Sequence, residues 1–520
     1  MVKLIDVEDA AFFLKDHHTL WIGGSGGGHA VPEALIISLE ERFNKTESPK
    51  SLTVIHAVGI GDWKETGVNR LAKSKLVKRS ICGTLSNSPK MANMAINGEI
   101  EAYTLPQGVL SQLTREMAAG RPGLITHVGL HTFIDPRIGG GRQGTKRGPD
   151  LINLIEIEGQ EWLHYKNFDI DVAFIRATTA DEKGNLTMEN EAVFGENLSI
   201  AQATKRSGGI VIAQVERLAQ NGTISGKDVK VPSIFVDYLI VDKEPWQTYT
   251  TKFDASYAGL IKKPIKDIPK IQLDVRKVIA RRAAMELFPN AVVNLGFGIA
   301  NGISSVAAEE EIYKDVTFTV EQGIIGGVPA LGNDAGAGVN FDAILDQPYQ
   351  FDFYDGGGLD LAFISFAEVD HTGNVNVSKF GERIVGPGGF INITQNSKKV
   401  FFLGTLTVGD FKAKIANGEL SIIQEGIKCK FVKDVEQITW SGSFALKRNQ
   451  KACYITERAV FDLTTEGIIL REIAPGINIE KDILQQIDFP IIVPTNVKYM
   501  DSRIFSPDIM RLKQELKKKK

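Results

Sequence analysis

The chain has 520 residues, of which 43% are hydrophobic and 24% are charged. This length is about three times that of an average domain, so we expect at least two domains. The 60 basic residues nearly balance the 63 acidic ones, and the formal net charge is -3. These values exclude a disordered or collagen-like chain, and they predict no general attraction to nucleic acid or anionic lipid.

The cysteines and the hydropathy of the chain indicate where the protein is expected to work. Cys82, Cys429 and Cys453 stand far apart, so the sequence predicts neither a disulfide framework nor a zinc site. No stretch approaches eighteen uncharged apolar residues, and the acidic N-terminus lacks the core of a signal peptide. We therefore expect a cytoplasmic protein that binds neither membrane nor nucleic acid and carries no metal.

Strand-like and helix-like patterns alternate along the first half of the chain. The run Thr19–Ile22 predicts a strand, residues 31–44 have helical spacing, and residues 52–57 predict another strand. Residues 243–274 interrupt this rhythm with lysine, proline, tyrosine and threonine. After them, residues 275–287 predict a helix and residues 291–295 a strand, so we place a domain boundary near residue 272.

An internal repeat relates the two halves of the chain. The segment DVAFI at 171–175 recurs as DLAFI at 360–364, and DEKGNL at 181–186 recurs as DHTGNV at 370–375, both with an offset of 189 residues. A weaker echo, at another offset, pairs GSG at 24–26 with GFG at 296–298. The sequence therefore predicts two similar open-sheet α/β domains, residues 1–272 and 273–520, with a ligand cleft between them.

The glycine-rich loops do not match nucleotide-binding motifs. GSGGGH at 24–29 places His29 where a dinucleotide fingerprint needs its third glycine, and GFGIANG at 296–302 is one residue too long. GGGRQGTK at 139–146 ends in Thr-Lys, whereas a P-loop requires lysine followed by serine or threonine. The first loop does match the nucleophile elbow of serine hydrolases, with Ser25 as the nucleophile, although a tight glycine turn produces this pattern easily.

Glu321 is the most informative acidic residue. It ends the apolar run 318–320 and is followed at once by the glycine-rich backbone of residues 322–329. This pattern would present its carboxylate at the carboxyl end of a strand, where backbone amides could hold it ionised, as a nucleophile requires. On this segment alone, the alternative is a turn or capping residue.

The run EQGIIG at 321–326 resembles the Glu-x-Gly signature of family I CoA-transferases. Other matching pieces follow the same order along nearly the whole chain: PE at 32–33, LPQG at 105–108, GFG at 296–298, FYDGGG at 353–358 and GPGG at 386–389. The chain looks closest to the single-chain bacterial acetate/propionate enzymes, which are related to succinyl-CoA:3-ketoacid CoA-transferases. It departs from the 3-ketoacid enzymes at Val320 and Gln322, where they commonly carry serine and asparagine, so the resemblance leaves the acyl specificity open.

This resemblance implies a mechanism. Glu321 would attack an acyl-CoA thioester, forming a mixed anhydride and then a glutamyl-CoA thioester. CoA would pass reversibly between short-chain acyl-CoA and free carboxylates of the acetate, propionate, butyrate or acetoacetate class. The side chain of Gln107 and the backbone amide of Gly389 or its neighbour Gly388 would stabilise the oxyanion of each tetrahedral intermediate.

The resemblance also implies the ligands and the assembly. CoA and acyl-CoA would bind as substrates, with Gly296, Gly298, Gly356 and Gly357 as close-approach backbone, and neither a permanent cofactor nor a metal would be needed. A homo-oligomer, either a dimer or a tetramer, is expected. Two alternatives stay open at this point: a serine hydrolase using Ser25, and a non-catalytic protein that binds acyl-CoA.

Overall fold

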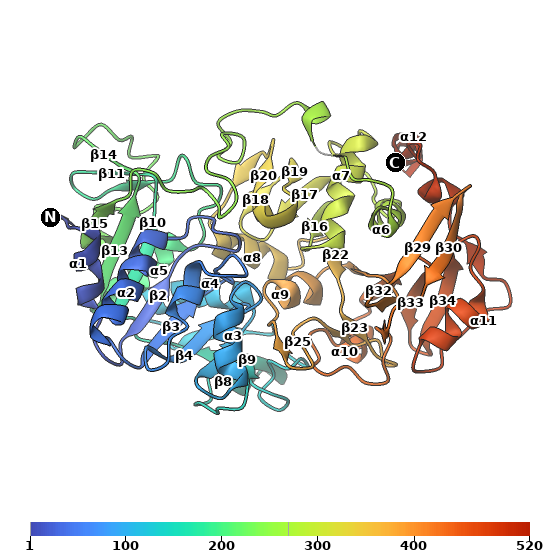
Figure 1. The fold of residues 1–520 in the computed structure, drawn as a ribbon, viewed down its shortest axis with the longest axis horizontal. Helices are drawn as coiled ribbons and strands as arrows, with labels where there is room; N and C mark the ends of the chain where they lie inside the picture. The colour runs from blue at the N-terminus through green and yellow to red at the C-terminus, as the bar shows by residue number, and fades with distance from the viewer. Residues whose placement is uncertain (1, 269, 520) are drawn as a thin grey trace.

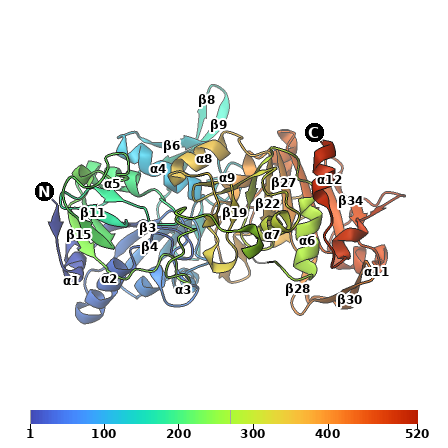
Figure 2. The same ribbon diagram turned by 90° about the horizontal axis from the view of Figure 1, so that it is seen from above.

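The structure, a computed structural model, describes residues 2–268 and 270–519. Two α/β halves lie side by side along the longest axis, with the N-terminus on the outer side of the first half and the C-terminus on the second (Figures 1 and 2). Each half is built on a large, mostly parallel sheet with helices packed against it. The predicted fold class, two similar open-sheet α/β halves, is confirmed.

The first sheet has nine strands, and all neighbouring strands are parallel except β5 and β7. In spatial order the strands are β1 (Lys3–Leu4), β15 (Tyr238–Val241), β13 (Ile210–Val215), β10 (Val172–Arg176), β2 (Thr19–Ile22), β3 (Leu52–His56), β4 (Val77–Cys82), β5 (Glu101–Thr104) and β7 (Arg142–Gln143). The predicted strands at 19–22 and 52–57 are thus present, the second one residue shorter than expected.

Helices cover both faces of the first sheet, because alternate side chains of a strand point to opposite sides. Trp21 and Ile55 belong to the core beside α4 (Gln107–Ala118) and α5 (Asn197–Arg206). Leu20 and Val54, their neighbours in the chain, belong to the core on the other face, beside α2 (Glu33–Thr46) and α3 (Pro89–Ile96). With both faces buried, the strands can be almost wholly apolar.

The second sheet has ten strands and mixes parallel with antiparallel neighbours. In spatial order they are β21 (Ala343–Ile344), β18 (Ile324–Ile325), β17 (Thr317–Val320), β16 (Val292–Leu295), β22 (Leu361–Ser365), β27 (Lys399–Leu403), β32 (Lys451–Ile455), β33 (Ala459–Thr464), β34 (Gly467–Ile473) and β35 (Lys498–Tyr499). The centre of the sheet, from β17 to β32, is parallel, like the first sheet.

Four helices of the second half matter for the site. They are α6 (Val275–Ala284), α7 (Gly302–Glu309), α8 (Gln347–Asp355) and α9 (Phe390–Gln395). Helix α6 begins where predicted, after Asp274, whose side chain accepts a hydrogen bond from the Lys277 N–H. It ends at Ala284, three residues earlier than expected.

The repeated segments occupy matching places in the two sheets. Strand β10 lies between β2 and β13, and β22 lies between β16 and β27. The aspartate before each strand accepts a backbone N–H from the neighbouring strand: Asp171 from Thr19 at 2.7 Å and Asp360 from Val292 at 2.9 Å. The repeat therefore preserves both the strand order and the hydrogen bond that sets the register.

Short helices and small sheets complete the chain. They are α1 (Val7–Ala10), β6 (Gly123–Thr126), β8 (Ile152–Ile157), β9 (Gln160–Lys166), β11 (Thr179–Asp181), β12 (Leu186–Thr187), β14 (Arg217–Ala219), β19 (Val328–Pro329), β20 (Gly338–Val339), β23 (Glu368–Val369), β24 (Val375–Asn376), β25 (Lys379–Phe380), β26 (Arg383–Ile384), β28 (Thr407–Val408), β29 (Lys412–Ala416), β30 (Glu419–Gln424), β31 (Lys428–Cys429), α10 (Gly442–Lys447), α11 (Ile479–Asp482) and α12 (Leu512–Leu516). In residues 2–268 and 270–519, no helix has both the length and the apolar character needed to cross a membrane.

The halves meet where α4 packs against α8 and α9. The segment between β15 and α6 adds further contacts, since the Tyr249 N–H donates to the Gly27 carbonyl at 2.6 Å and Thr248 Oγ1 donates to Asp334 at 2.6 Å. The boundary expected near residue 272 lies in this connecting segment and stays a prediction.

Candidate active site

A cavity of about 440 Å³ lies between the two halves. Both halves line it: the first with residues that include Gly26, Gly27, Trp63, Thr84, Asn87 and Gln107, and the second with residues that include Gly296, Phe297, Glu321, Gln322, Gly388 and Gly389. Five of the residues predicted from the sequence thus line one cavity, although they are spread over 283 positions from Gln107 to Gly389.

Glu321 lies at the carboxyl end of strand β17. The strand ends at Val320, and the chain reverses immediately into β18, which pairs antiparallel with β17. This reversal needs glycine at position 323, because its φ is +114° and a Cβ atom there would lie 2.0 Å from the Leu345 carbonyl oxygen. Gly323 therefore allows the tight turn that presents the Glu321 carboxylate.

Burial raises the pKa of the Glu321 carboxyl above its usual range. Hydrogen bonds from its own backbone N–H and from the side chains of Gln322 and Asn294 oppose this effect but do not overcome it. The Gln322 amide nitrogen lies 3.3 Å from Oε1 of Glu321. The loss of water on burial therefore has a larger effect on this pKa than the few hydrogen bonds, and the expectation that backbone amides help to hold the carboxylate ionised stays a prediction.

The glycine loop 386–389 approaches Glu321 from one side. A Cβ atom on Gly389 would lie 3.4 Å from Cγ of Glu321, so the Gly389 backbone lies directly beside the glutamate side chain. The Gly388 N–H donates to the Gly83 carbonyl at 2.8 Å, and the Gly388 carbonyl accepts the backbone N–H of Gln107 at 2.8 Å. Within the described residues, the Gly389 N–H has no acceptor, so of the two predicted amides only this one is free.

Gln107 is the first residue of helix α4 and is buried at the cavity wall. Its side-chain Nε2 donates to Oε1 of Gln347, the first residue of α8, at 3.1 Å. Gln107 therefore begins a helix and holds a hydrogen bond between the two halves.

Comparison with known proteins identifies the family. Residues 5–242 match the model of the Coenzyme A transferase family. The acetate CoA-transferase YdiF of Escherichia coli O157:H7 is 43% identical over 97% of this chain and 95% of its own length, and the caffeate CoA-transferase of Acetobacterium woodii is 43% identical over 97% and 98%. The crystal structure of the E. coli O157:H7 acyl-CoA transferase YdiF, as a thioester complex with CoA, superposes with a TM-score of 0.93 at 43% identity and covers 98% of this chain and 97% of that one.

The chain belongs to the coenzyme A transferase family. The predicted family is thereby confirmed, including its likeness to bacterial acetate CoA-transferases and the prediction that the protein is an enzyme. The relatives match along nearly their whole length, so the likeness extends over both halves of the chain.

The predicted CoA-binding glycines of this CoA-transferase fall into two groups. Gly296 lines the cavity and Gly298 lies two residues further on, beside Phe297, which is 61% exposed and stacks on Trp63 from the first half. Gly356 and Gly357 lie at the C-terminal end of α8 and are not among the residues that line the cavity. The structure thus places Gly296 at the cavity and Gly298 next to the lining residue Phe297, and it leaves Gly356 and Gly357 outside the cavity lining.

Ser25 has no catalytic partner in this CoA-transferase. Its side chain is buried, and Oγ has no hydrogen-bond partner among the described residues. The nearby His29 uses Nε2 on the Ala335 carbonyl, so the serine and the histidine form no nucleophile–base pair. The glycine loop around Ser25 is a tight turn whose next residues, Gly26 and Gly27, line the cavity.

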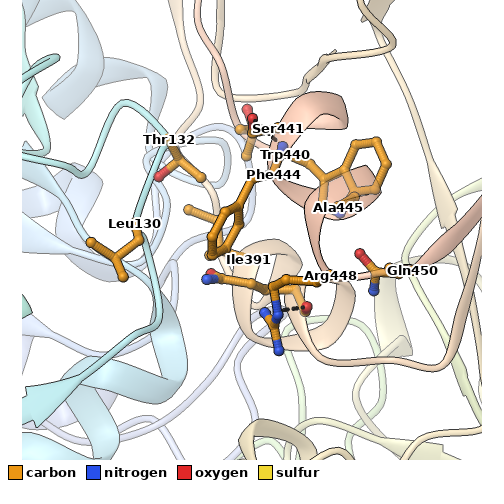
Figure 3. A pocket seen from close by; sticks show the side chains of 11 residues that line it. Leu130, Thr132, Ile391, Trp440, Ser441, Phe444, Ala445, Arg448 and Gln450 are labelled. Atoms are coloured by element: carbon orange, nitrogen blue, oxygen red, sulfur yellow. Dashed lines mark hydrogen bonds between the residues drawn. The ribbon is translucent and has the colours of Figure 1, made fainter. Parts of the chain in front are cut away.

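A second hollow between the halves is too small for a substrate. Figure 3 shows Leu130 and Thr132 from the first half facing Ile391 and Phe444 from the second. The volume is about 10 Å³, which is room for a single water molecule. Across residues 2–268 and 270–519, histidine, cysteine, aspartate and glutamate side chains form no group of three that could hold a metal ion.

Several residues of the site carry no signal in the sequence. Trp63 and Asn294 lie outside every motif, and so do Gln347 and Glu196, which extend the hydrogen bonds of Gln107. A buried glutamine or glutamate looks the same in a sequence as an exposed one, and only contacts from distant segments reveal the difference.

Proposed function

We propose that this CoA-transferase moves CoA reversibly between short-chain acyl-CoA and free carboxylates through a glutamyl-CoA thioester on Glu321. The observation that carries the proposal is the position of the Glu321 carboxyl, which lines the cavity between the halves and lies beside the Gly389 backbone. The related E. coli protein, whose crystal structure is a thioester complex with CoA, supports the same chemistry here.

The reaction proceeds through two exchanges at one carboxyl group. The Glu321 carboxylate attacks the thioester carbonyl of acyl-CoA and the carbon–sulfur bond breaks. CoA departs as a thiolate, and the acyl group is now joined to Glu321 in a mixed anhydride. The thiolate then attacks the glutamyl carbonyl, which releases the first carboxylate and leaves CoA on Glu321. A second carboxylate reverses both steps. The raised pKa of Glu321 favours the attack, because a more basic carboxylate is a stronger nucleophile once it is ionised.

Two donors are placed to stabilise the oxyanion of each tetrahedral intermediate. The Gly389 N–H is free, whereas the Gly388 N–H is engaged with Gly83, so we assign the backbone donor to Gly389. The Gln107 side chain lines the cavity and donates from Nε2 to Gln347, so its oxyanion role would use the second N–H of the same nitrogen. Each donor is held by hydrogen bonds from the other half: the loop of Gly389 through Gly388 and Gly83, and Gln107 through Gly388 and Gln347.

The remaining assignments rest on the sequence. Gly296 and Gly298, with the aromatic pair Trp63 and Phe297 close by, are proposed to contact CoA. For Gly356 and Gly357 the same role stays a prediction from the resemblance alone. A cytoplasmic location, a homo-oligomeric state and the preference for short-chain acids also stay predictions.

Labelling of the nucleophile tests the proposal directly. Acyl-CoA alone should convert the enzyme into a glutamyl thioester, which borohydride reduces, inactivating the protein. Mass spectrometry should then find the reduced residue in the peptide that contains Glu321. E321Q, which keeps the shape but lacks the nucleophilic charge, serves as the matched control and should show neither labelling nor exchange.

Other outcomes would contradict the assignment. Labelling at a different residue, or labelling that persists in E321Q, would remove Glu321 from the mechanism. A protein that binds acyl-CoA but is never labelled and exchanges no CoA would support the alternative of a non-catalytic binding protein.

A further inference from the structure

Arg383 is the one cation among the residues that line the cavity between the halves, counted over the described chain. Glu321, the proposed nucleophile, is the one anion, and all the other lining side chains of the described chain are uncharged. Arg383 is the first residue of β26 and is exposed, so it lies where the cavity opens to solvent. The cavity therefore offers one carboxyl group for chemistry and a separate positive charge at its opening.

The guanidinium group of Arg383 is available to a ligand. Within the described chain its side chain forms no hydrogen bond and no ion pair, and it lies over the ring of Phe380, with 5.6 Å between the guanidinium carbon and the ring centroid. Phe380 also lines the cavity. Arginine presents its N–H groups in a planar fork that matches the oxygens of a phosphate group. The unpaired arginine at the opening is therefore suited to an anionic group of this shape.

Other charged side chains near Arg383 do not line the cavity. Lys379, on the partner strand β25, pairs with Glu436 at 3.1 Å. Lys430 donates from Nζ to the Phe366 carbonyl at 3.1 Å and lies 4.7 Å from the centroid of the same ring. Glu382, the residue before Arg383, is exposed. None of Lys379, Lys430 and Glu382 is a lining residue, so Arg383 is the cation that a ligand inside the cavity meets.

The segment that follows Arg383 lines the cavity as far as Glu321. It runs through Val385 to the glycine loop 386–389, whose last residue lies beside the Glu321 side chain. The segment is anchored, because the Val385 carbonyl accepts the Leu85 N–H at 2.7 Å and the hydroxyl of Thr84 at 2.7 Å. Apolar side chains line the same cavity: Ile364, Phe366, Val377, Phe380, Val385, Phe390 and Ile393. These features fit a ligand with a reactive end, an apolar stretch and an anionic end.

We infer that Arg383 binds a phosphate group of CoA at the opening of the cavity. This inference rests on the proposed function, in which the sulfur of CoA reaches Glu321. CoA carries its phosphates at the other end of the pantetheine arm from the sulfur, so they must lie away from Glu321 and toward the opening. Arg383 lies there, exposed and unpaired within the described chain, and the apolar side chains of the cavity accommodate the arm.

The affinity for free CoA tests the inference without any chemical step. R383Q removes the charge at an exposed position, so it should fold, and titration calorimetry should show the Kd of CoA raised by about tenfold. R383K keeps the charge but not the planar fork, and it should raise this Kd by about threefold. Added salt should weaken the binding of CoA more in the wild type than in R383Q, because salt screens the pair of charges.

Lys379 provides a matched control. K379Q removes the same charge from the same hairpin, but Lys379 does not line the cavity and is already paired with Glu436. This variant should change the Kd of CoA by less than about twofold, because an exposed ion pair contributes little.

Shortened substrates identify the group that Arg383 binds. Acyl-pantetheine carries no phosphate, so wild type and R383Q should use it with the same kcat/KM, whereas R383Q should use acyl-CoA less well than the wild type. Dephospho-CoA lacks only the ribose phosphate. If the wild type and R383Q bind it equally, Arg383 contacts the ribose phosphate, and if R383Q still binds it about tenfold more weakly, Arg383 contacts the diphosphate.

Three results would overturn the role of Arg383 and leave the proposed function in place. They are a wild-type Kd of CoA in R383Q, an equal loss of kcat/KM for acyl-pantetheine and acyl-CoA, and a raised KM for the carboxylate substrate alone. Failure of acyl-CoA to label Glu321 in the wild type would instead overturn the proposed mechanism. The change in affinity for CoA would still decide whether Arg383 binds phosphate, because it is measured without the reaction.

Discussion

Glu321 and Glu196 show how surroundings give one side-chain type two different tasks. Burial raises the pKa of both carboxyl groups, that of Glu196 to about 8. Glu321 lines a cavity large enough for a substrate, whereas Glu196 is enclosed by Ser111 and Gln347 and acts as a hydrogen-bond acceptor. Access to the cavity, and not the shifted pKa alone, therefore separates the proposed nucleophile from the enclosed carboxyl of Glu196.

The raised pKa of Glu196 predicts that the stability of the protein depends on pH. Its usual pKa is 4.5, and burial together with the charge of Asp346 raises it to about 8 in the folded protein. Between these values the folded state keeps a proton that the unfolded chain releases, so the stability contributed by Glu196 is complete below about pH 4.5 and is lost as the pH rises to about 8. E196Q cannot titrate and should not lose this contribution.

The expected result is a change in the difference between the two melting temperatures. The Tm of E196Q minus the Tm of the wild type should be larger at about pH 8.5 than at about pH 5. Thermal unfolding of both proteins at both pH values measures this difference. Asp355, a buried carboxyl whose pKa is raised to about 7, is present in both proteins and cancels in the comparison. An equal difference at both pH values would show that Glu196 does not titrate in this range.

Helix α4 is the element that joins the two halves at the site. Its first residue is Gln107, and the N–H of its second residue, Gly108, donates to the side chain of Asn392 in α9 at 3.1 Å. Asn392 in turn donates to Asp355 of α8 at 3.0 Å. A Cβ atom on Gly108 would lie 2.5 Å from both Asn392 and Phe351, so glycine is what allows α4 to approach this closely.

Gly108→Ala should therefore destabilise the protein, although alanine favours helices. The gain in helix propensity is about 1 kcal/mol, while forcing a methyl group into a packed interface costs about 1–3 kcal/mol and would also displace Gln107. We expect a lower Tm and a lower kcat, measured by thermal unfolding and by CoA exchange. Gly226→Ala is the control, because a Cβ atom there would meet nothing within 4 Å. A G108A protein as stable and active as G226A would show that the interface can adjust.

At the scale of the whole molecule, two similar halves enclose one cavity and contribute different parts to it. The first half supplies Gln107, and the second supplies Glu321 and Gly389. In the proposed mechanism the first carboxylate leaves before the second binds, because CoA stays on the glutamyl group between the two exchanges.

Two-substrate kinetics should reflect this order. Initial rates measured over a grid of acyl-CoA and carboxylate concentrations should give parallel double-reciprocal lines, because CoA remains on the enzyme between the two half-reactions. Lines that intersect would indicate that both substrates bind before any chemistry, and would contradict a covalent CoA–enzyme intermediate.

The sequence by itself determined the fold class, the repeat and the position of the proposed nucleophile. Strands such as β2 and β3 follow from short apolar runs, and α6 begins at the predicted residue because Asp274 caps it. Glu321 stood out because a glycine-rich turn follows a strand. All of these are local features, in which neighbouring residues set the backbone conformation.

Only the tertiary structure decided which groups are free, buried or paired. Gly389 and not Gly388 has a free N–H because Gly83, some 300 residues away, accepts the other one. The Ser25 hydroxyl is buried and has no hydrogen-bond partner among the described residues, and Glu196 is paired with Gln347 because α5 and α8 each begin where α4 packs. Burial and hydrogen bonding depend on segments that are distant in the chain, and their effects on pKa and orientation arise only when folding brings those segments together and removes water from between them.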